Sequence, residues 1–198
     1  MKKLLIFLAV AALPAAAQWR KFGEGVRVEG SFGVGVATPL TPIGRQLDTG
    51  WGLSGGVGVS GRFLGVMLDA SYTDMGVNHE TLRRLGAPSG DQRYWSLTVD
   101  PLFHVNRRGP VDFYLTGGGG LYSQITDFHV QLDGPYPGGH THYSNSIYKP
   151  GVNGGAGFSF NVGGYHNRVK VFAEARLHHM FIGESGASYI PVSFGVRF

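Results

Sequence analysis

The stretch Ile190-Pro-Val-Ser-Phe-Gly-Val-Arg-Phe198 decides the fold of this chain. Successive side chains of an extended strand point to opposite faces. One face of this stretch is apolar and carries Ile190, Val192, Phe194, Val196 and Phe198. The other face is small or polar and carries Pro191, Ser193, Gly195 and Arg197. This alternation predicts a β-strand whose two faces meet different surroundings.

Seven earlier segments show the same period of two. The first runs from Val26 up to a loop that begins at Thr38. The others are Trp51–Ser60, Leu64–Thr73, Gln92–His104, Val111–Ser123, Tyr148–Asn161 and Val169–His178. Proline cannot donate a hydrogen bond to a strand ladder, so we expect a β-bulge near Pro101. The sequence therefore predicts an all-β chain of eight strands.

The connections between these segments alternate between long and short. The long ones are Thr38–Gly50, Asp74–Asp91, Gln124–Ile147 and His179–Tyr189. The short ones are Gly61–Phe63, Asn106–Pro110 and Val162–Arg168. Within the second long connection, Asn78 is expected to cap a single helical turn through Arg84 that Gly86 ends. Alternating connections predict an antiparallel, up-and-down order of strands.

These features resemble the small bacterial outer-membrane barrels of the OmpA/OmpX type, which have long outer loops and short periplasmic turns. The resemblance covers residues 26–198 and implies an eight-stranded antiparallel up-and-down transmembrane β-barrel. In that family a closing strand that ends in Phe resembles the signal read by the barrel-assembly machinery, which implies this role for Phe194, Val196 and Phe198. The implied partners are outer-membrane lipid, lipopolysaccharide and that machinery. The implied roles are envelope integrity, adhesion or surface defence.

The amino-terminal residues have the pattern of a secretory signal. Lys2 and Lys3 precede an apolar run, Leu4–Leu13, and Ala15 to Ala17 supply a small-residue cleavage site. The run is shorter than the ~20 residues that a membrane-spanning helix needs. We therefore expect a cleaved signal peptide at 1–17, a barrel domain at 18–198 and export to the bacterial outer membrane.

The composition excludes several function classes. Loss of Lys2 and Lys3 lowers the formal charge from +4 to +2, and no basic face is clustered, so nucleic-acid binding is not expected. The chain has no cysteine, which excludes disulfides and thiolate metal sites. Neither a cofactor nor a resident metal is expected.

Alternation alone fits two architectures, a soluble exported carrier with an apolar interior and a membrane barrel with an apolar exterior. In the predicted register the apolar faces carry no charge. The opposite faces carry Arg27, Arg93, Lys170, Arg176, Arg197, Glu29, Asp69, Asp100, Asp112 and Glu174. Aromatic side chains form two bands, Trp51, Tyr72 and Trp95 next to the long loops and Phe103, Phe113, Phe160 and Phe198 at the other ends. Such bands are typical of membrane interfaces, so we predict that lipid contacts the apolar faces.

An eight-stranded barrel is only wide enough for its own side chains. Glu174 and Arg176 lie two positions apart and are expected to point inward at mid-depth. We predict a structural ion-pair network in the lumen that consists of Asp69, Arg93, Asp100, Glu174 and Arg176. The alternative for the same residues is a narrow pore or a proton pathway.

One short motif points to chemistry. His142-Tyr143-Ser144-Asn145 resembles the His-x-Ser-Asn of outer-membrane lipid A deacylases, in which a histidine activates a serine. In those enzymes an acidic residue follows about a dozen positions later, where this chain has Ala156. His129, His140 and His142 share the same predicted loop and offer imidazoles to a metal. Arg45, Arg83 and Arg84 lie in predicted outer loops and could contact phosphates. We expect a non-enzymatic protein and keep the hydrolase as an alternative.

Overall fold

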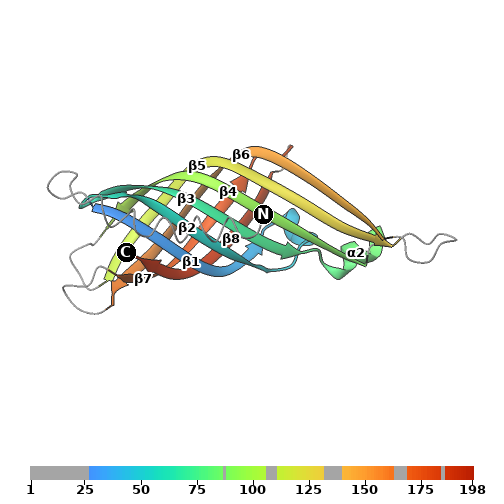
Figure 1. Ribbon diagram of the computed structural model, residues 1–198, viewed down its shortest axis with the longest axis horizontal. Helices are drawn as coiled ribbons and strands as arrows, with labels where there is room; N and C mark the ends of the chain where they lie inside the picture. The colour runs from blue at the N-terminus through green and yellow to red at the C-terminus, as the bar shows by residue number, and fades with distance from the viewer. Residues whose placement is uncertain (1–26, 87, 106–110, 132–139, 163–168, 184–185) are drawn as a thin grey trace.

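The described residues of the chain form one closed barrel. The computed structural model describes residues 27–86, 88–105, 111–131, 140–162, 169–183 and 186–198, without the side chains of 85, 128–131 and 140–143. Its eight strands pair antiparallel in chain order, and the last returns to the first (Figure 1). The strands are β1 Arg27–Pro39, β2 Gly50–Ser60, β3 Leu64–Gly76, β4 Ser89–His104, β5 Val111–Gln131, β6 His140–Asn161, β7 Lys170–Met180 and β8 Ala187–Arg197. The predicted fold class and strand order are confirmed.

The closure between β1 and β8 depends on the stretch that ends the chain. Val34 lies opposite Phe194, and Val36 lies opposite Val192. Gly30 and Phe198 exchange two backbone hydrogen bonds, of 2.8 and 2.9 Å. The same residues of β1 pair with β2 on their other side, where Val34 lies opposite Leu53. Both edges of β1 are therefore occupied, and a closed sheet has no free edge along the wall.

The prediction of the longest loop is wrong. Instead of a connection over Gln124–Ile147, β5 continues to Gln131 and β6 begins at His140. The two strands stay in register from Ser123↔Tyr148 to Gln131↔His140. Figure 1 shows this hairpin running to the end of the molecule beside helix α2. Exposed polar residues such as Ser144 and Asn145 resemble loop formers, yet outside lipid a polar strand is as well hydrated as a loop.

The β-bulge expected at Pro101 is also absent from the described strands. Val99 pairs with Gly119 and Leu102 pairs with Thr116, so neither strand contains an inserted residue between these pairs. Pro101 points outward and is exposed. Pro101 has no N–H to donate, and it has no paired residue on β5. On its other side it still lies opposite Val66 of β3.

The predicted helical turn is present as α2, His79–Leu85. The Asn78 side chain accepts a hydrogen bond from Thr81 N, and Gly86 ends the helix with φ of 65°. The Asn78 side chain also donates to the carbonyl of Arg45, beside the short 3-10 helix η1, Ile43–Arg45. The first two long connections therefore fold onto each other. No helix in the described part of the chain is long and apolar enough to cross a membrane.

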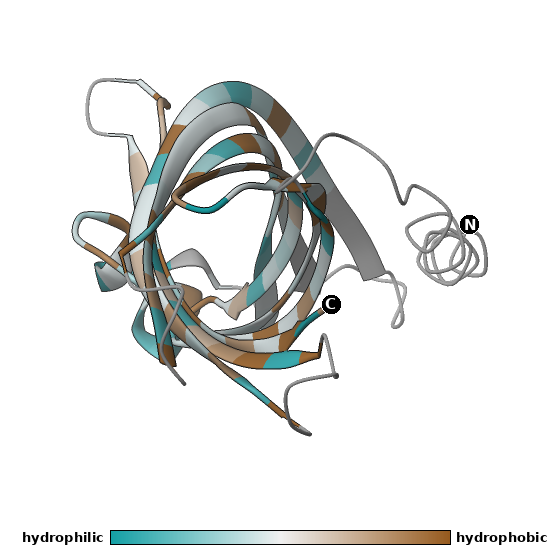
Figure 2. Ribbon diagram, turned by 90° about the vertical axis from the view of Figure 1, so that its left-hand side faces the viewer, coloured by the Kyte–Doolittle hydropathy of each residue, from teal (hydrophilic) through white to brown (hydrophobic). Residues whose placement is uncertain are grey.

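The two faces of the wall have the predicted polarity. Phe194, Leu121 and Val34 on the outer face keep 60%, 65% and 49% of their surface exposed. Asp100 and Thr98 on the inner face keep 0% and 2%. Figure 2 shows the barrel obliquely from one end, with hydrophobic and hydrophilic positions alternating along the ribbons. The chain is thus an inverted barrel, apolar outside and polar inside.

Aromatic side chains and charges mark where the apolar exterior stops. Trp51 and Trp95 each contact Tyr72, with ring centroids 5.5 and 4.7 Å apart. One step beyond them the outer face becomes charged. Tyr72 donates a 3.0 Å hydrogen bond to Asp74, and Arg93 pairs with Asp127. A belt of amphipathic rings followed by charges is the pattern expected at a membrane–water interface.

Candidate functional site

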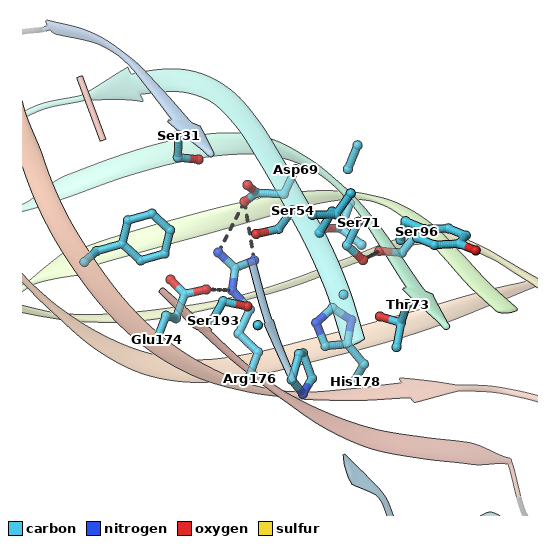
Figure 3. A pocket seen from close by; sticks show the side chains of 18 of the residues that line it. Ser31, Ser54, Asp69, Ser71, Thr73, Ser96, Glu174, Arg176, His178 and Ser193 are labelled. Carbon is cyan, nitrogen blue, oxygen red and sulfur yellow. Dashed lines mark hydrogen bonds and ion pairs between the residues drawn. The ribbon is translucent and has the colours of Figure 1, made fainter. Parts of the chain in front are cut away.

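Arg176 of β7 holds a network of charges at mid-depth in the lumen. Its Nη1 donates to Asp100 Oδ2 at 2.8 Å and to Asp69 Oδ2 at 3.4 Å. Its Nε donates to Glu174. Figure 3 shows the guanidinium between Asp69 on one side and Glu174 on the other. We call Arg176, Asp69, Asp100 and Glu174 the Arg176 network. Charge-assisted bonds of this kind are the strong hydrogen bonds of proteins.

Neutral side chains complete the coordination of Asp100. Thr98 Oγ1 donates to its Oδ2 at 2.8 Å, and Asn153 Nδ2 donates to its Oδ1 at 2.8 Å. Both carboxylate oxygens are therefore satisfied although Asp100 is fully buried. Because an unsatisfied buried charge is costly, these bonds make ionised Asp100 compatible with the lumen.

Glycines across the strands make room for the Arg176 network. Gly56 lies opposite Asp69, Gly155 opposite Arg176 and Gly157 opposite Glu174. A Cβ at Gly56 would stand 2.1 Å from an Asp69 oxygen, and one at Gly155 would stand 2.8 Å from Arg176 Cγ. So narrow a lumen has room for long charged side chains only where the residue opposite is a glycine, which has no side chain.

Arg197 of β8 extends the network toward the end that carries the short turns, which we call the turn end. Its Nη2 lies 3.9 Å from Glu174 Oε2, and its guanidinium lies over the rings of Tyr114 at 4.5 Å and Phe172 at 5.3 Å. The predicted set of network residues omitted Arg197. The sequence signal for Arg197 was its place on the inward-facing side of the closing strand, together with Ser193 and Gly195.

Arg93 does not belong to the Arg176 network. It pairs with Asp127 of β5, and 38% of its side chain is exposed. Arg93 has the parity of Trp95 and Leu97, whose side chains point outward, so its assignment to the inner face was wrong. It also lies seven positions along β4 from Asp100, which is roughly 23 Å at the rise of a strand.

The opposite end, which carries α2 and the β5–β6 hairpin, is closed by apolar and aromatic side chains. We call it the loop end. Leu47, Val77 and Leu82 from the long connections pack with buried residues of the wall, and together they form the loop-end cap. Its wall residues are Ala37, Met75, Tyr94, Tyr122, Met180, Ala187 and Tyr189. The sequence placed Tyr94 inward and gave no sign that the loops would pack on it.

Rings connect the loop-end cap to the Arg176 network. His178 stacks on Tyr189 at 5.1 Å, and its Nδ1 lies 3.1 Å from the Tyr122 hydroxyl. A cavity runs beside the Arg176 network and is lined by Ser31, Ser54, Asp69, Ser71, Arg176 and His178, among others (Figure 3). Its volume of about 40 Å³ is enough for a few water molecules at roughly 10–15 Å³ each.

The predicted assembly-signal residues lie on the outer face or at the seam. Phe194 and Val196 are 60% and 38% exposed. The Phe198 ring lies over Gly30, where a Cβ would stand 2.7 Å from it. These positions leave the two outward side chains accessible from the lipid phase.

The predicted hydrolase motif lies on a strand and not in a loop. His142 and Ser144 are both in β6, and Ser144 is exposed. The side chains of His129, His140 and His142 lie outside the described residues, so the motif and the possible metal site stay hypotheses. Among the side chains that are described, no group of three or more histidines, aspartates or glutamates is placed to hold a metal.

Comparisons with known proteins agree with this architecture. The family model described as outer membrane protein β-barrel domain matches residues 4–198. The search among curated proteins gave no match.

Several solved structures share the fold. A major outer membrane protein from Thermus thermophilus aligns with a TM-score of 0.63 at 12% identity, covering 87% of this chain and 98% of that one. Neisserial surface protein A aligns with a TM-score of 0.57 at 19% identity, covering 88% and 98%. Ail of Yersinia pestis, solved with the heparin analogue sucrose octasulfate, aligns with a TM-score of 0.50 at 19% identity, covering 86% and 99%. At these identities the likeness establishes the fold alone.

Proposed function

Because the chain belongs to the family of outer membrane protein β-barrel domains, we propose that it is a closed, non-enzymatic anchor that displays its loops at the bacterial cell surface. The inverted polarity of the wall is the observation that carries this proposal. Phe194 is 60% exposed outside while Asp100 is fully buried inside. An apolar outer face on a barrel with a polar interior is the pattern of a barrel in contact with lipid.

The closed lumen argues against the alternative of a narrow pore. The Arg176 network spans the middle of the barrel, where its carboxylates come from β3, β4 and β7. The loop-end cap covers the same lumen further out, with Tyr94, Tyr189 and Met180 fully buried. A passing ion would have to break the charge pairs and displace the rings. The proposal is therefore an anchor whose functional surface lies outside the barrel.

The β5–β6 hairpin is the element displayed most prominently. Pairing between β6 and β7 ends at Gly151↔Met180, whereas β5 and β6 remain paired to Gln131↔His140. These further positions, about ten, correspond to roughly 33 Å of strand. The outer part of this hairpin includes Ser144, Asn145, Ser146, Tyr148 and Lys149, all of them exposed. It offers hydroxyl, amide and ammonium groups to a surface partner.

At the loop end, the partner that best fits the exposed side chains is the phosphate groups of lipopolysaccharide. Arg45 and α2 are joined by the 2.7 Å bond from Asn78 to the Arg45 carbonyl. Arg45, Arg83 and Arg84 are exposed on this folded unit. Guanidinium groups bind phosphate oxygens with two parallel hydrogen bonds. Cleavage after Ala17 and recognition of Phe194, Val196 and Phe198 by the assembly machinery complete the proposed route to the membrane.

Single-channel recording tests the closed lumen. We expect purified protein in a planar bilayer to show no steady conductance, and the Arg176→Ala variant to open more often because the network loses the cation that bridges its three carboxylates. Arg62→Ala, which alters an exposed charge outside the lumen, is the matched control and should behave like wild type. Steady conductance of the wild-type protein would instead favour the pore.

Epitope tags test the display. A tag inserted between Gln131 and His140 should bind antibody on intact cells, whereas a tag in the Gly61–Phe63 turn should bind only after the outer membrane is opened. The reverse result would contradict the proposed orientation. For the hydrolase alternative, lipid A acylation should be the same with wild type and with Ser144→Ala.

A further inference from the structure

Ser60, His104 and Asp112 form a hydrogen-bonded chain at the turn end, separate from the Arg176 network. Ser60 Oγ lies 3.0 Å from His104 Nε2, and His104 Nδ1 lies 2.9 Å from Asp112 Oδ2. Ser60 is the last residue of β2, His104 is the last of β4, and Asp112 is the second of β5. The register of neighbouring strands brings these positions together, because β2 and β4 both pair with β3, and β5 pairs with β4.

The order of atoms in this chain is that of a serine–histidine–aspartate triad. The hydroxyl contacts Nε2 and the carboxylate contacts Nδ1, as in enzymes that activate a serine. An ionised carboxylate only accepts hydrogen bonds, so with Asp112 ionised the proton of neutral His104 sits on Nδ1. The Nε2 lone pair then faces the hydroxyl of Ser60. This tautomer is the one that can take the proton of Ser60.

Two neighbours support that arrangement. Lys170 Nζ lies 3.4 Å from the same Oδ2 of Asp112, which favours the ionised carboxylate. Gly65 lies opposite Ser60 in the β2–β3 pair, and a Cβ there would stand 3.2 Å from Ser60 Oγ. The absence of that Cβ leaves the hydroxyl room to turn across β3 toward His104.

We propose that Ser60 is an activated serine that accepts an acyl or phosphonyl group from small, neutral electrophiles. Ser60 is fully buried, which restricts the class of electrophile to small molecules that enter from the turn end. The residues that closely follow Ser60 and His104 are near the surface there, with Phe63 and Val105 exposed at 61% and 69%. The proposed step is one acylation or phosphonylation of Ser60 without turnover, so it is compatible with a non-enzymatic anchor, goes beyond surface display and does not depend on it.

The reaction has a simple balance. With a fluorophosphonate, the Ser60 Oγ–P bond forms as the P–F bond breaks. The proton of Ser60 passes to His104 Nε2 and leaves with fluoride. With an aryl ester, the Oγ–C bond forms, and the phenol departs with the same proton. Asp112 touches neither reactant and acts as a positioning residue for the imidazole.

Labelling of the full-length protein in micelles with a fluorophosphonate probe, followed by peptide mass mapping, tests this inference. We expect one label, on Ser60, that is absent in Ser60→Ala. His104→Gln should slow labelling by about 10²–10⁴-fold, the usual contribution of a general base. Asp112→Asn should slow labelling as well, while it leaves the hydroxyl of Ser60 in place.

The chain contains a matched control. Ser188 Oγ lies 2.7 Å from His179 Nδ1 on the outer face, and within the described residues the ring of His179 contacts Ser188 and Phe181 but no carboxylate. Ser188→Ala should leave labelling unchanged. A wild-type protein that stays unlabelled while a serine hydrolase in the same tube is fully labelled would overturn the proposal. Labelling of Ser188 in place of Ser60 would overturn it too, and this mapping on wild type holds even if a variant fails to fold.

Discussion

The lumen is closed twice, at mid-depth by charges and at the loop end by rings and methionines. In the Arg176 network one guanidinium serves carboxylates from three strands, and Asp100 is held by Arg176, Thr98 and Asn153. In the loop-end cap the burial is shared among many side chains, some of which come from the long connections. Charge pairing concentrates stability in one residue, whereas apolar packing spreads it over many. The two closures should therefore respond differently to single substitutions.

Arg176→Met should have the largest effect. It leaves Asp69, Asp100 and Glu174 buried without their shared cation, and breaking a buried ion pair typically costs about 3–5 kcal/mol. Urea unfolding in detergent micelles measures the loss in free energy of unfolding. A variant that also carries Asp69→Asn and Asp100→Asn should recover part of it. A loss no larger than that of a surface charge would show that the network is not a structural centre.

Met180→Ala should cost less, although Met180 is fully buried. Removal of a buried methionine side chain usually costs about 2–5 kcal/mol, and we expect the lower part of that range because loop residues of the cap can move into the space. Met180→Leu, which nearly conserves volume, is the control. If Met180→Ala were as damaging as Arg176→Met, the contrast between concentrated and distributed closure would fail.

Asn78→Ala should loosen the loops that bring Leu82 to the cap. It removes the cap bond to Thr81 N, at 2.9 Å, and the bond to the Arg45 carbonyl. Loss of an N-cap costs about 1 kcal/mol. Limited proteolysis of α2 should accelerate while the barrel itself stays folded. Asn78→Ser, which can still cap the helix, should restore only part of the protection.

Arg93→Met should have a smaller effect than Arg176→Met and shows how location changes the contribution of a charge. Arg93 pairs with Asp127 outside the lumen, where 38% of the Arg93 side chain but only 5% of the Asp127 side chain is exposed. We expect a loss between the roughly 0–1 kcal/mol of an exposed pair and the about 3–5 kcal/mol of a buried one. Urea unfolding beside Arg176→Met compares two arginines of the same wall. Equal losses would mean that the outer face at Arg93 is far less hydrated than its position implies.

The fold could be predicted from the sequence because a barrel wall repeats one simple rule. Alternation in Ile190–Phe198 and the order of long and short connections were sufficient for strand number, order and polarity. The capping residues Asn78 and Gly86 were sufficient to predict α2, because each acts on the helix end next to it in the sequence. These features depend on neighbours in the sequence.

Other features depend on register, which the sequence does not display. Ser60 and His104 come into contact only because β3 pairs with both of their strands in this register. Leu47 reaches the loop-end cap only once the loops have folded. The length of the β5–β6 hairpin was missed because polar strand and polar loop look alike. The error at Arg93 was avoidable, since its parity is that of Trp95.

A cysteine scan of β8 in lipid vesicles tests most directly which face meets lipid. The chain has no cysteine, so single substitutions at Pro191, Ser193, Phe194 and Val196 can each carry one spin label. We expect labels at Phe194 and Val196 to collide with oxygen dissolved in the bilayer, and labels at Pro191 and Ser193 to be shielded from it. The opposite alternation, with oxygen reaching Pro191 and Ser193 but not Phe194 and Val196, would contradict the inverted barrel.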